Sequence, residues 1–352
     1  MTALPTRFQN YKQSLSQVLT QLLAEQKQEF RSVGSLSDEV WDHILQTSLA
    51  GKMIRGSLSV FIYELLKNDP QPGVQLGVAW ELFNTGVLMH DDIIDQDRLR
   101  RGLPSTYAHY EKNASDAKWD HPTHFGVSMA ICVGDICLFS VNNALSKIQT
   151  SQEILSGILK LFSRETIMTG FGEMKDTQET YDSRALSEAE IKAIMIEKTA
   201  RYTFVLPMVS AAMLAGEAPT TLEIVSKLGD TLGILFQIKD DELGLFGMTS
   251  QIGKPAGSDI REAKQTFFYL YLKQRVEATD PVLKIFGKPE VTEAEIQKVQ
   301  QSVISHGAKA KVDELVAELD QEAQTLIEML PWSEDAKKSL HQLRQAQLHR
   351  TK

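Results

Sequence analysis

The stretch VQLGVAWELFNTGVLMHDDIID, residues Val74–Asp95, predicts an apolar helix that ends in acids. Its apolar residues have helical spacing and lead into three aspartates. Asp91 and Asp95 are four residues apart, which places both carboxylates on one helical face about 6 Å apart. Acids at the end of an apolar helix repel one another and lose hydration, so a divalent cation that neutralises them is favoured. Oxygen ligands select Mg²⁺ or Mn²⁺, and Mg²⁺ keeps positions open for phosphate, so the expected ligand is a diphosphate.

The same helical spacing continues through most of the chain, and no segment has the alternation expected of strands. Capping boxes predict helix starts after Ser187, paired with Glu190, and after Thr292, paired with Glu295. No break is long or disordered in composition, so we expect one helical bundle, a single domain over residues 1–352. The expected breaks are residues 68–73, 112–123, 177–187, 217–219, 247–257 and 287–291.

Composition excludes several classes of partner. The net charge of −9 argues against a general affinity for nucleic acid or anionic lipid, because both recruit basic surfaces. The two cysteines, Cys132 and Cys137, lie in an apolar helical run and fit reduced thiols, which favours the cytoplasm. The residues up to Glu29 have amphipathic spacing and predict a first helix rather than a signal peptide. Because the most apolar run, Phe204–Leu214, is short and contains proline, we expect no membrane-spanning segment.

Basic residues accompany the first acid cluster. An isolated DDxxD is more often a solvated helix end than a metal site, but Arg98-Leu99-Arg100-Arg101-Gly102 follows within ten residues. Guanidinium groups match phosphate oxygens in a bidentate manner, so this neighbourhood favours a phosphate site.

A second acid cluster repeats the pattern. Phe236-Gln237-Ile238-Lys239-Asp240-Asp241 again ends an apolar helix, and Gly253-Lys254-Pro255 follows it. A third basic element, Gly51-Lys52-Met53-Ile54-Arg55-Gly56, places two cations three residues apart between glycines that permit close backbone approach. On its own this element could be ordinary surface charge.

In this order, the elements resemble the trans-type prenyl diphosphate synthases, the family that makes farnesyl, geranylgeranyl and longer polyprenyl diphosphates. The resemblance covers residues 51–266 and implies an all-α fold, a single large helical bundle of the isoprenoid synthase type with a central active-site cavity. It also implies a homodimer. The pieces that carry it, beside the three elements above, are Gly134-Asp135, Lys198-Thr199-Ala200, Asp259 and Lys264.

The resemblance further implies roles for individual residues. Mg²⁺, or Mn²⁺ in its place, would be bound by Asp91, Asp95 and Asp240, with Asp92 and Asp241 in support. The allylic diphosphate would be held by Arg100, Lys198 and Lys254. Isopentenyl diphosphate would be held by Lys52, Arg55 and Arg101. Gln237 and the backbone near Lys198 and Thr199 would direct dipoles at the allylic cation.

Three departures from the family pattern qualify these roles. Met53 and Gly56 replace an arginine and a proline of the first basic element, although Lys52 and Arg55 remain. Asn84 stands where many members have His or Gln, and its amide can still donate to phosphate. Gly244 replaces the third aspartate of the second cluster, so that a full second DDxxD is absent.

The helix that leads into Asp91 also suggests what limits the chain length of the product. Val87 and Phe83 continue the face of Asp91 away from the metal, and one helical turn of about 5.4 Å matches roughly one isoprene unit. Gly86 and Val87 are small, which disfavours a farnesyl-length stop, whereas Phe83 and then Trp80 could close the tunnel. We therefore expect geranylgeranyl diphosphate, a C20 product, with a longer polyprenyl chain as the alternative. Phe83 could equally be ordinary helix core.

Two rival functions are less well supported. A class I terpene cyclase would share the fold and a DDxxD, but it would have no use for a second diphosphate pocket made by Lys52, Arg55 and Arg101. A non-catalytic subunit of a heteromeric synthase would not need the intact first acid cluster.

Overall fold

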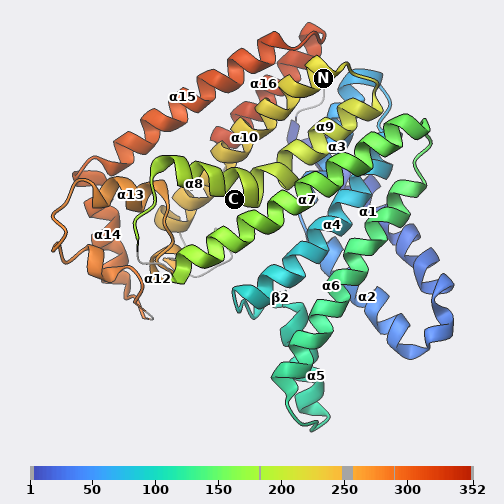
Figure 1. The fold of residues 1–352 in the computed structure, drawn as a ribbon, viewed down its shortest axis with the longest axis horizontal. Coiled ribbons are helices and arrows are strands. Elements are labelled where there is room, and N and C mark those ends of the chain that lie inside the picture. Colours follow the sequence, from blue (N-terminus) through green and yellow to red (C-terminus); the bar gives the residue numbers. More distant parts are fainter. Residues whose placement is uncertain (1–3, 182–183, 248–256, 289, 350–352) are drawn as a thin grey trace. The chain divides into compact units, whose positions relative to one another are not determined.

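The computed structural model describes residues 4–181, 184–247, 257–288 and 290–349. Apart from two strands of two residues each, the regular elements in these ranges are helices, which confirms the all-α prediction (Figure 1). The chain forms two compact units, Met1–Leu159 with Pro207–Glu217, and Lys160–Leu206 with Ala218–Lys352. The single domain over residues 1–352 stays a prediction.

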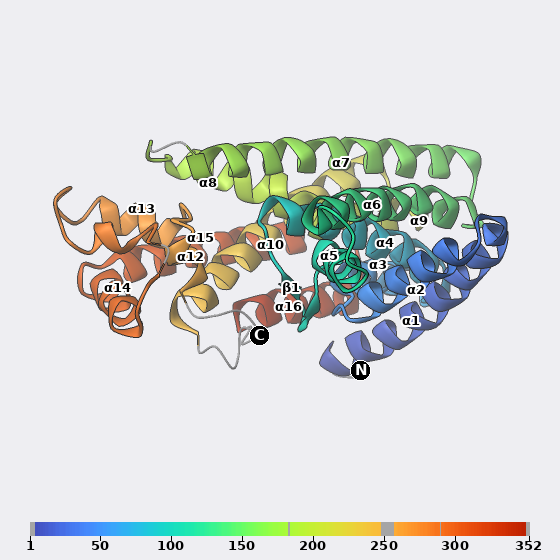
Figure 2. The same ribbon diagram turned by 90° about the horizontal axis from the view of Figure 1, so that it is seen from below.

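The first unit is built around one long apolar helix, α4. This helix is buried on nearly all sides, as expected of a helix without a continuous polar face. It packs against α3, α6, α1 and α5, while α1 and α2 lie side by side (Figure 2). The elements of this unit are α1 (Leu4–Glu29), η1 (Arg31–Val33), α2 (Ser35–Leu49), α3 (Ile54–Lys67), α4 (Gln71–Ile94), β1 (Leu99–Arg100), β2 (Leu103–Pro104), α5 (Thr106–Asp116), α6 (Pro122–Ser146), the start of α7 (Gln152–Tyr181) and most of α9 (Leu206–Leu214).

The second unit is built around α10, which packs against η2, α15 and α16. Its η2 is a π-helix of 11 residues, an unusual length because most π-helical segments are single turns. Besides the remainder of α7, the elements are α8 (Glu188–Ile194), η2 (Met195–Val205), α10 (Pro219–Phe246), α12 (Ser258–Arg261), α13 (Phe267–Lys273), η3 (Leu283–Ile285), α14 (Glu293–Ser305), α15 (Ala308–Met329) and α16 (Glu334–Leu348).

Local sequence signals predict most helix limits. Both capping boxes are present, with the Ser187 and Thr292 hydroxyls accepting from the backbone N–H of Glu190 and Glu295. Helix ends also fall within or beside the breaks expected at residues 68–73, 112–123, 177–187 and 217–219. The break at 247–257 lies largely outside the described residues, and the break at 287–291 lies partly outside them.

One apolar helix bears on the expectation that no segment spans a membrane. Among the described residues, α6 has 25 residues and an 18-residue window with a mean hydropathy of 1.7, enough by length and composition to cross a membrane. A single such helix is weak evidence for a span, since the core helix of a soluble protein passes the same test. In the first unit α6 packs against α4 and α5, and Ile131, Ile136 and Phe139 are exposed on it.

Candidate active site

The first acid cluster lies at the C-terminal end of α4. Asp91 and Asp92 occupy its last turn, and Asp95 caps the helix by donating its backbone N–H to the Asp91 carbonyl at 2.9 Å. Asp92 is buried, Asp91 is half-buried and Asp95 is exposed. Three predicted metal ligands therefore lie together but in different environments.

A tight hairpin follows the acids and positions the two predicted phosphate-binding arginines. Leu99 pairs with Pro104 and Arg100 with Leu103 across β1 and β2. Arg101 and Gly102 form the turn with φ values of 56° and 77°, and two positive φ values are typical of a type I′ turn. Positive φ is strained for arginine, so the chain holds Arg101 in a conformation that arginine rarely adopts.

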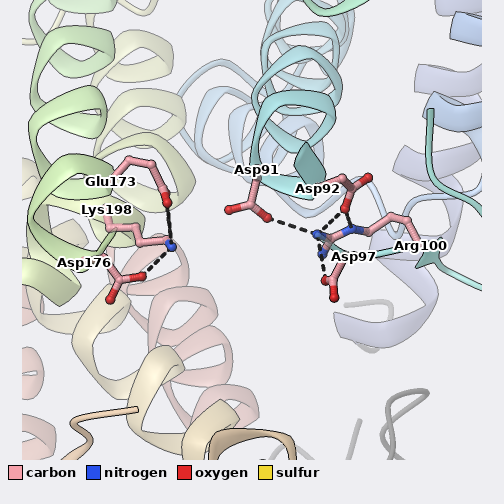
Figure 3. A network of polar contacts seen from close by, with 7 residues as sticks. All are labelled: Asp91, Asp92, Asp97, Arg100, Glu173, Asp176 and Lys198. Atoms are coloured by element: carbon pink, nitrogen blue, oxygen red, sulfur yellow. Dashed lines mark hydrogen bonds and ion pairs between the residues drawn. The ribbon is translucent and has the colours of Figure 1, made fainter. Parts of the chain in front are cut away.

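Arg100 binds the acids directly (Figure 3). Its Nε donates to Asp92 Oδ1 at 2.6 Å, and its Nη2 donates to Asp91 Oδ2 at 3.0 Å. Nη2 also lies 3.4 Å from Asp97 Oδ2. The residue predicted to hold the allylic diphosphate thus neutralises two predicted metal ligands and a third acid, Asp97, which the sequence analysis did not single out.

The protonation of Asp92 is shifted by its surroundings. Burial raises the pKa of Asp92 to about 6, although the positive charge of Arg100 opposes that rise. The Asp92 side chain is only 4% exposed, against 16% for Asp91. Asp92 is therefore better placed to hold Arg100 than to reach a ligand in solvent.

The second basic pocket is organised by a buried glutamate on α4. Glu81 is 3% exposed, and its Oε1 accepts the backbone N–H of Gly56 at 2.7 Å. Burial raises the pKa of Glu81, while the Gly56 hydrogen bond and the charges of Arg55 and Arg101 oppose the rise. The structure therefore brings Arg55 and Arg101 into electrostatic range of one carboxylate, and Lys52 is exposed on the loop that precedes α3.

Arg101 and Asn84 complete this neighbourhood. Arg101 Nη1 donates to the carbonyl of Thr47 at 3.3 Å. A methyl group added at Gly51 would lie 3.0 Å from the Arg101 guanidinium carbon, so the glycine makes room for that side chain. Asn84, one turn after Glu81, is 2% exposed, and its Oδ1 has no hydrogen-bond partner among the described residues. A buried, unsatisfied amide oxygen is costly unless water or a ligand satisfies it.

The described part of the first unit contains a small cavity and a larger one. The smaller, about 80 Å³, is lined by Asp92, Arg100, Arg101, His43 and His109 among others. The larger, an apolar groove of about 580 Å³ among α1, η1, α2 and α6, is lined by none of the predicted site residues. The central cavity implied by the family resemblance stays a prediction.

The residues predicted to set product length lie on α4. Phe83 and Trp80 are fully buried, and the Trp80 indole N–H donates to Ser210 Oγ at 3.1 Å. Val87 is half-buried. A methyl group added at Gly86 would lie 2.9 Å from the Gly134 carbonyl oxygen, so this glycine permits close packing of α6. That contact gives Gly86 a packing role that the argument from tunnel size did not include.

In the second unit, Lys198 occupies the π-helix η2. Its Nζ lies 2.6 Å from Asp176 Oδ2 and 3.1 Å from Glu173 Oε1, both on α7 (Figure 3). Thr199, the next residue, is half-buried. As with Arg100, a predicted phosphate-binding cation is neutralised by nearby acids.

The second acid cluster has one buried and one exposed aspartate. Asp241 is 3% exposed, and its Oδ1 accepts from Lys264 Nζ at 3.0 Å and from Gln237 Nε2 at 3.2 Å. Burial raises the pKa of Asp241 to about 6, an effect that the Lys264 charge opposes. Asp240 is exposed beside it. Lys254 lies outside the described residues.

The glycine in the second cluster lies beside a carboxylate. A methyl group added at Gly244 would lie 2.7 Å from Asp259 Oδ2, so a larger residue at position 244 would require the Asp259 side chain to shift. Asp259 stands on α12, fifteen positions later in the chain. The place where the family pattern has an aspartate side chain is therefore next to an acid from another helix.

Sequence reasoning assigned no role to several residues that shape the site. Glu81 carries a signal that could have identified it, because it is the one acid in the apolar run from Val74 to His90. Glu173 and Asp176 also carry a sequence signal, because their three-residue spacing places two acids on one helical face. Asp97 is three residues before Arg100, but the segment between them is not helical, so the helical spacing rule does not predict their contact.

Known proteins resemble this chain over most of its length. Residues 36–303 match the polyprenyl synthetase family model. The geranylgeranyl diphosphate synthase of Sulfolobus acidocaldarius is 29% identical over 250 residues, 70% of this chain and 71% of the relative. A short chain isoprenyl diphosphate synthase of Methanocaldococcus jannaschii is 30% identical over 251 residues, which are 70% of this chain and 71% of that relative. A Corynebacterium glutamicum geranylgeranyl pyrophosphate synthase, solved with isoprenyl diphosphate and magnesium, superimposes with a TM-score of 0.88 at 25% identity and covers 97% of this chain and 98% of its own.

Proposed function

Because the chain belongs to the polyprenyl synthetase family and is a prenyltransferase, we propose that it joins isopentenyl diphosphate to an allylic diphosphate and releases geranylgeranyl diphosphate. The observation that carries the site assignment is the cluster at the end of α4, where Arg100 meets Asp91 and Asp92. A diphosphate with its metal ions can replace both halves of this contact, because the metal takes the carboxylates and the phosphate takes the guanidinium.

Magnesium is the expected cofactor. Asp91, Asp95 and Asp240 would hold it, supported by Asp92 and Asp241, and Mn²⁺ could substitute. The donors fit, since all are carboxylate oxygens, and the buried Oδ2 of Asp241 has no hydrogen-bond partner among the described residues. No three His, Cys, Asp or Glu side chains in the described ranges converge tightly enough to hold an ion alone, which fits ions that take ligands from substrate phosphate and water. When bound, Mg²⁺ would stabilise the negative charge that develops on the departing diphosphate.

Two sets of cations would bind the two substrates. Arg100, Lys198 and Lys254 would hold the allylic diphosphate. Lys52, Arg55 and Arg101 would hold isopentenyl diphosphate, and Asn84 would donate its amide to the phosphate. Because Arg100 and Lys198 are paired with acids here, substrate binding would exchange carboxylate partners for phosphate oxygens.

The chemistry is an ionisation followed by condensation and elimination. The allylic carbon–oxygen bond breaks, and the diphosphate leaves with the bonding electrons into the field of the basic residues. The double bond of isopentenyl diphosphate then attacks the allylic cation, and the new cation loses a proton. Gln237 and the backbone at Lys198 and Thr199 would direct dipoles at the cation, and exclusion of water would protect it from capture.

Product length would be limited by α4. Val87 leaves room one turn before Asp91, and the buried Phe83 would close the tunnel after a C20 chain. The full burial of Phe83 and Trp80 supports a closed end at this depth.

Assembly and location belong to the same proposal. The exposed Ile131, Ile136 and Phe139 on α6 support a homodimer, since large apolar side chains at the surface favour an interface. Cys132 and Cys137 are both free, which supports a reducing compartment such as the cytoplasm. Light scattering on the purified chain tests the homodimer, and a monomer at micromolar concentration would contradict it.

The direct test is to incubate the purified chain with Mg²⁺, isopentenyl diphosphate and dimethylallyl, geranyl or farnesyl diphosphate, and then to measure product length. We expect C20 products. Asp91→Ala and Asp240→Ala should each lower turnover by about 100-fold or more while the fold persists, because each removes a metal ligand. Near-normal turnover in either variant would refute the metal role of that residue, and absence of isopentenyl diphosphate consumption by the unaltered chain would refute the proposed reaction.

A further inference from the structure

The π-helix η2 is fixed by close contacts on two sides. A methyl group added at Gly172 on α7 would lie 2.6 Å from the Glu197 carbonyl carbon, and one added at Gly233 on α10 would lie 2.6 Å from the Ala200 Cα. Backbones of both neighbouring helices therefore touch η2 directly. Its hydrogen bonds span five residues, as in the bond from Leu206 N–H to the Arg201 carbonyl.

A group of three charged residues, of which Glu165 is buried and Arg201 and Asp230 are half-buried, joins the same three helices. Arg201 on η2 places Nη1 3.7 Å from Glu165 Oε1 on α7, and its Nε lies 3.2 Å from Asp230 Oδ1 on α10. The Glu165 side chain is 0% exposed, and its two oxygens have no hydrogen-bond partner among the described residues. We call Glu165, Arg201 and Asp230 the charge triad.

The charge triad is poorly explained as a source of stability. Burial raises the pKa of both Glu165 and Asp230, and the Arg201 charge opposes that rise. Apolar residues of similar volume often stabilise a protein as well as a buried ionic group does, whereas such groups can select one arrangement among several. The triad joins η2 to α7 and α10 and could specify how η2 lies between them.

We propose that Glu165, Arg201 and Asp230 are positioning residues, which hold η2 in its π-helical form so that Lys198 and Thr199 face the allylic diphosphate. This inference rests on the proposed function of Lys198. Arg201 lies three residues after Lys198 on η2. Lys198 reaches Glu173 and Asp176 on α7, while Arg201 reaches Glu165 on α7 and Asp230 on α10. With Arg201 held by the charge triad, the winding of η2 between the two residues sets where Lys198 lies.

The test removes all three charges at once. Glu165→Leu/Arg201→Met/Asp230→Leu should fold with a melting temperature near that of the unaltered chain, because no unpaired charge remains buried. Its kcat should fall by about 100-fold, since small misplacements of positioning groups have effects of that size. The KM for the allylic diphosphate should rise, and the KM for isopentenyl diphosphate should change less than about twofold, because its predicted pocket lies on other elements.

A matched control removes a different buried ion pair. Arg344 on α16 donates to Asp320 on α15 at 2.6 Å, and its side chain is 8% exposed. Arg344→Met/Asp320→Leu should leave kcat unchanged. If the triple variant keeps the kcat of the unaltered chain, the charge triad has no positioning role and the proposal is overturned.

Two further measurements keep the proposal testable whatever the triple variant does. Hydrogen exchange of the amides in Met195–Val205 should accelerate by at least about tenfold in the triple variant while those of α10 keep their rates, a result independent of catalysis. Equal exchange would overturn the proposal even if the proposed reaction itself fails. Should the triple variant not fold, Glu165→Gln and Arg201→Lys preserve side-chain volume, and unchanged kcat and allylic KM in both would overturn it.

Discussion

Replacing His43 with Phe should remove a large part of the acid sensitivity of the first unit. His43 lies on α2 and is 8% exposed, with Nε2 3.0 Å from Thr106 Oγ1. Its ring stacks on that of His109 with centroids 4.7 Å apart. Burial, together with the neighbouring His109 ring, lowers the pKa of the His43 imidazole to about 4.

The loss of stability at low pH follows from the pKa of His43 in the unfolded and in the folded chain. The unfolded chain binds a proton at His43 below its ordinary pKa of about 6.5, whereas the folded chain binds it only below about 4. Between these values the unfolded state holds more protons, so stability falls as the pH is lowered. From about pH 7 to about pH 5 the loss is about 2 kcal/mol, and it approaches about 3 kcal/mol below pH 4.

Urea unfolding followed by tryptophan fluorescence measures this loss, and the buried Trp41 lies two residues from His43 on α2. The free energy of unfolding should fall by about 2 kcal/mol more in the unaltered chain than in His43→Phe between the two pH values. Phe keeps an aromatic ring against His109, and the lost Thr106 hydrogen bond lowers stability equally at both pH values. His124→Phe, which changes an exposed histidine, should behave like the unaltered chain. Equal pH dependence in His43→Phe and the unaltered chain would refute the assignment of this proton to His43.

Four other predictions concern the site and its helix. Glu81→Gln should raise the KM for isopentenyl diphosphate about tenfold, because the buried charge beside Arg55 and Arg101 is lost; an unchanged KM in steady-state assays would contradict this. Phe83→Ala should lengthen the products seen by chromatography, and products of unchanged length would show that Phe83 does not close the tunnel. Gly86→Val should lower the free energy of unfolding by about 1–3 kcal/mol, since the added carbons collide with α6; an unaltered melting temperature would exclude that contact. Chelation with EDTA should abolish turnover, with recovery on adding Mg²⁺ or Mn²⁺, and persistent turnover in EDTA would refute the metal requirement.

The chain sequence predicts the helical fold because the forces that form helices act over short distances along the chain. The Ser187 and Thr292 capping boxes join residues three apart, and helical periodicity repeats every three or four residues. For the same reason Asp91 and Asp95 could be placed near one another before the fold was known. The family resemblance supplied the roles of Lys52, Arg55 and Lys198, which no local rule provides.

Other features depend on residues far apart in the chain and were decided only by the tertiary structure. The burial of Glu81 within electrostatic range of Arg55 and Arg101, the carboxylate of Asp259 beside Gly244, and the three helices joined by Arg201 are of this kind. The length of the apolar α6 could have been read from the sequence, but its packing on α4 could not. The physical reason is that burial and ion pairing depend on which helices pack together, and packing is set by the whole chain rather than by any one segment.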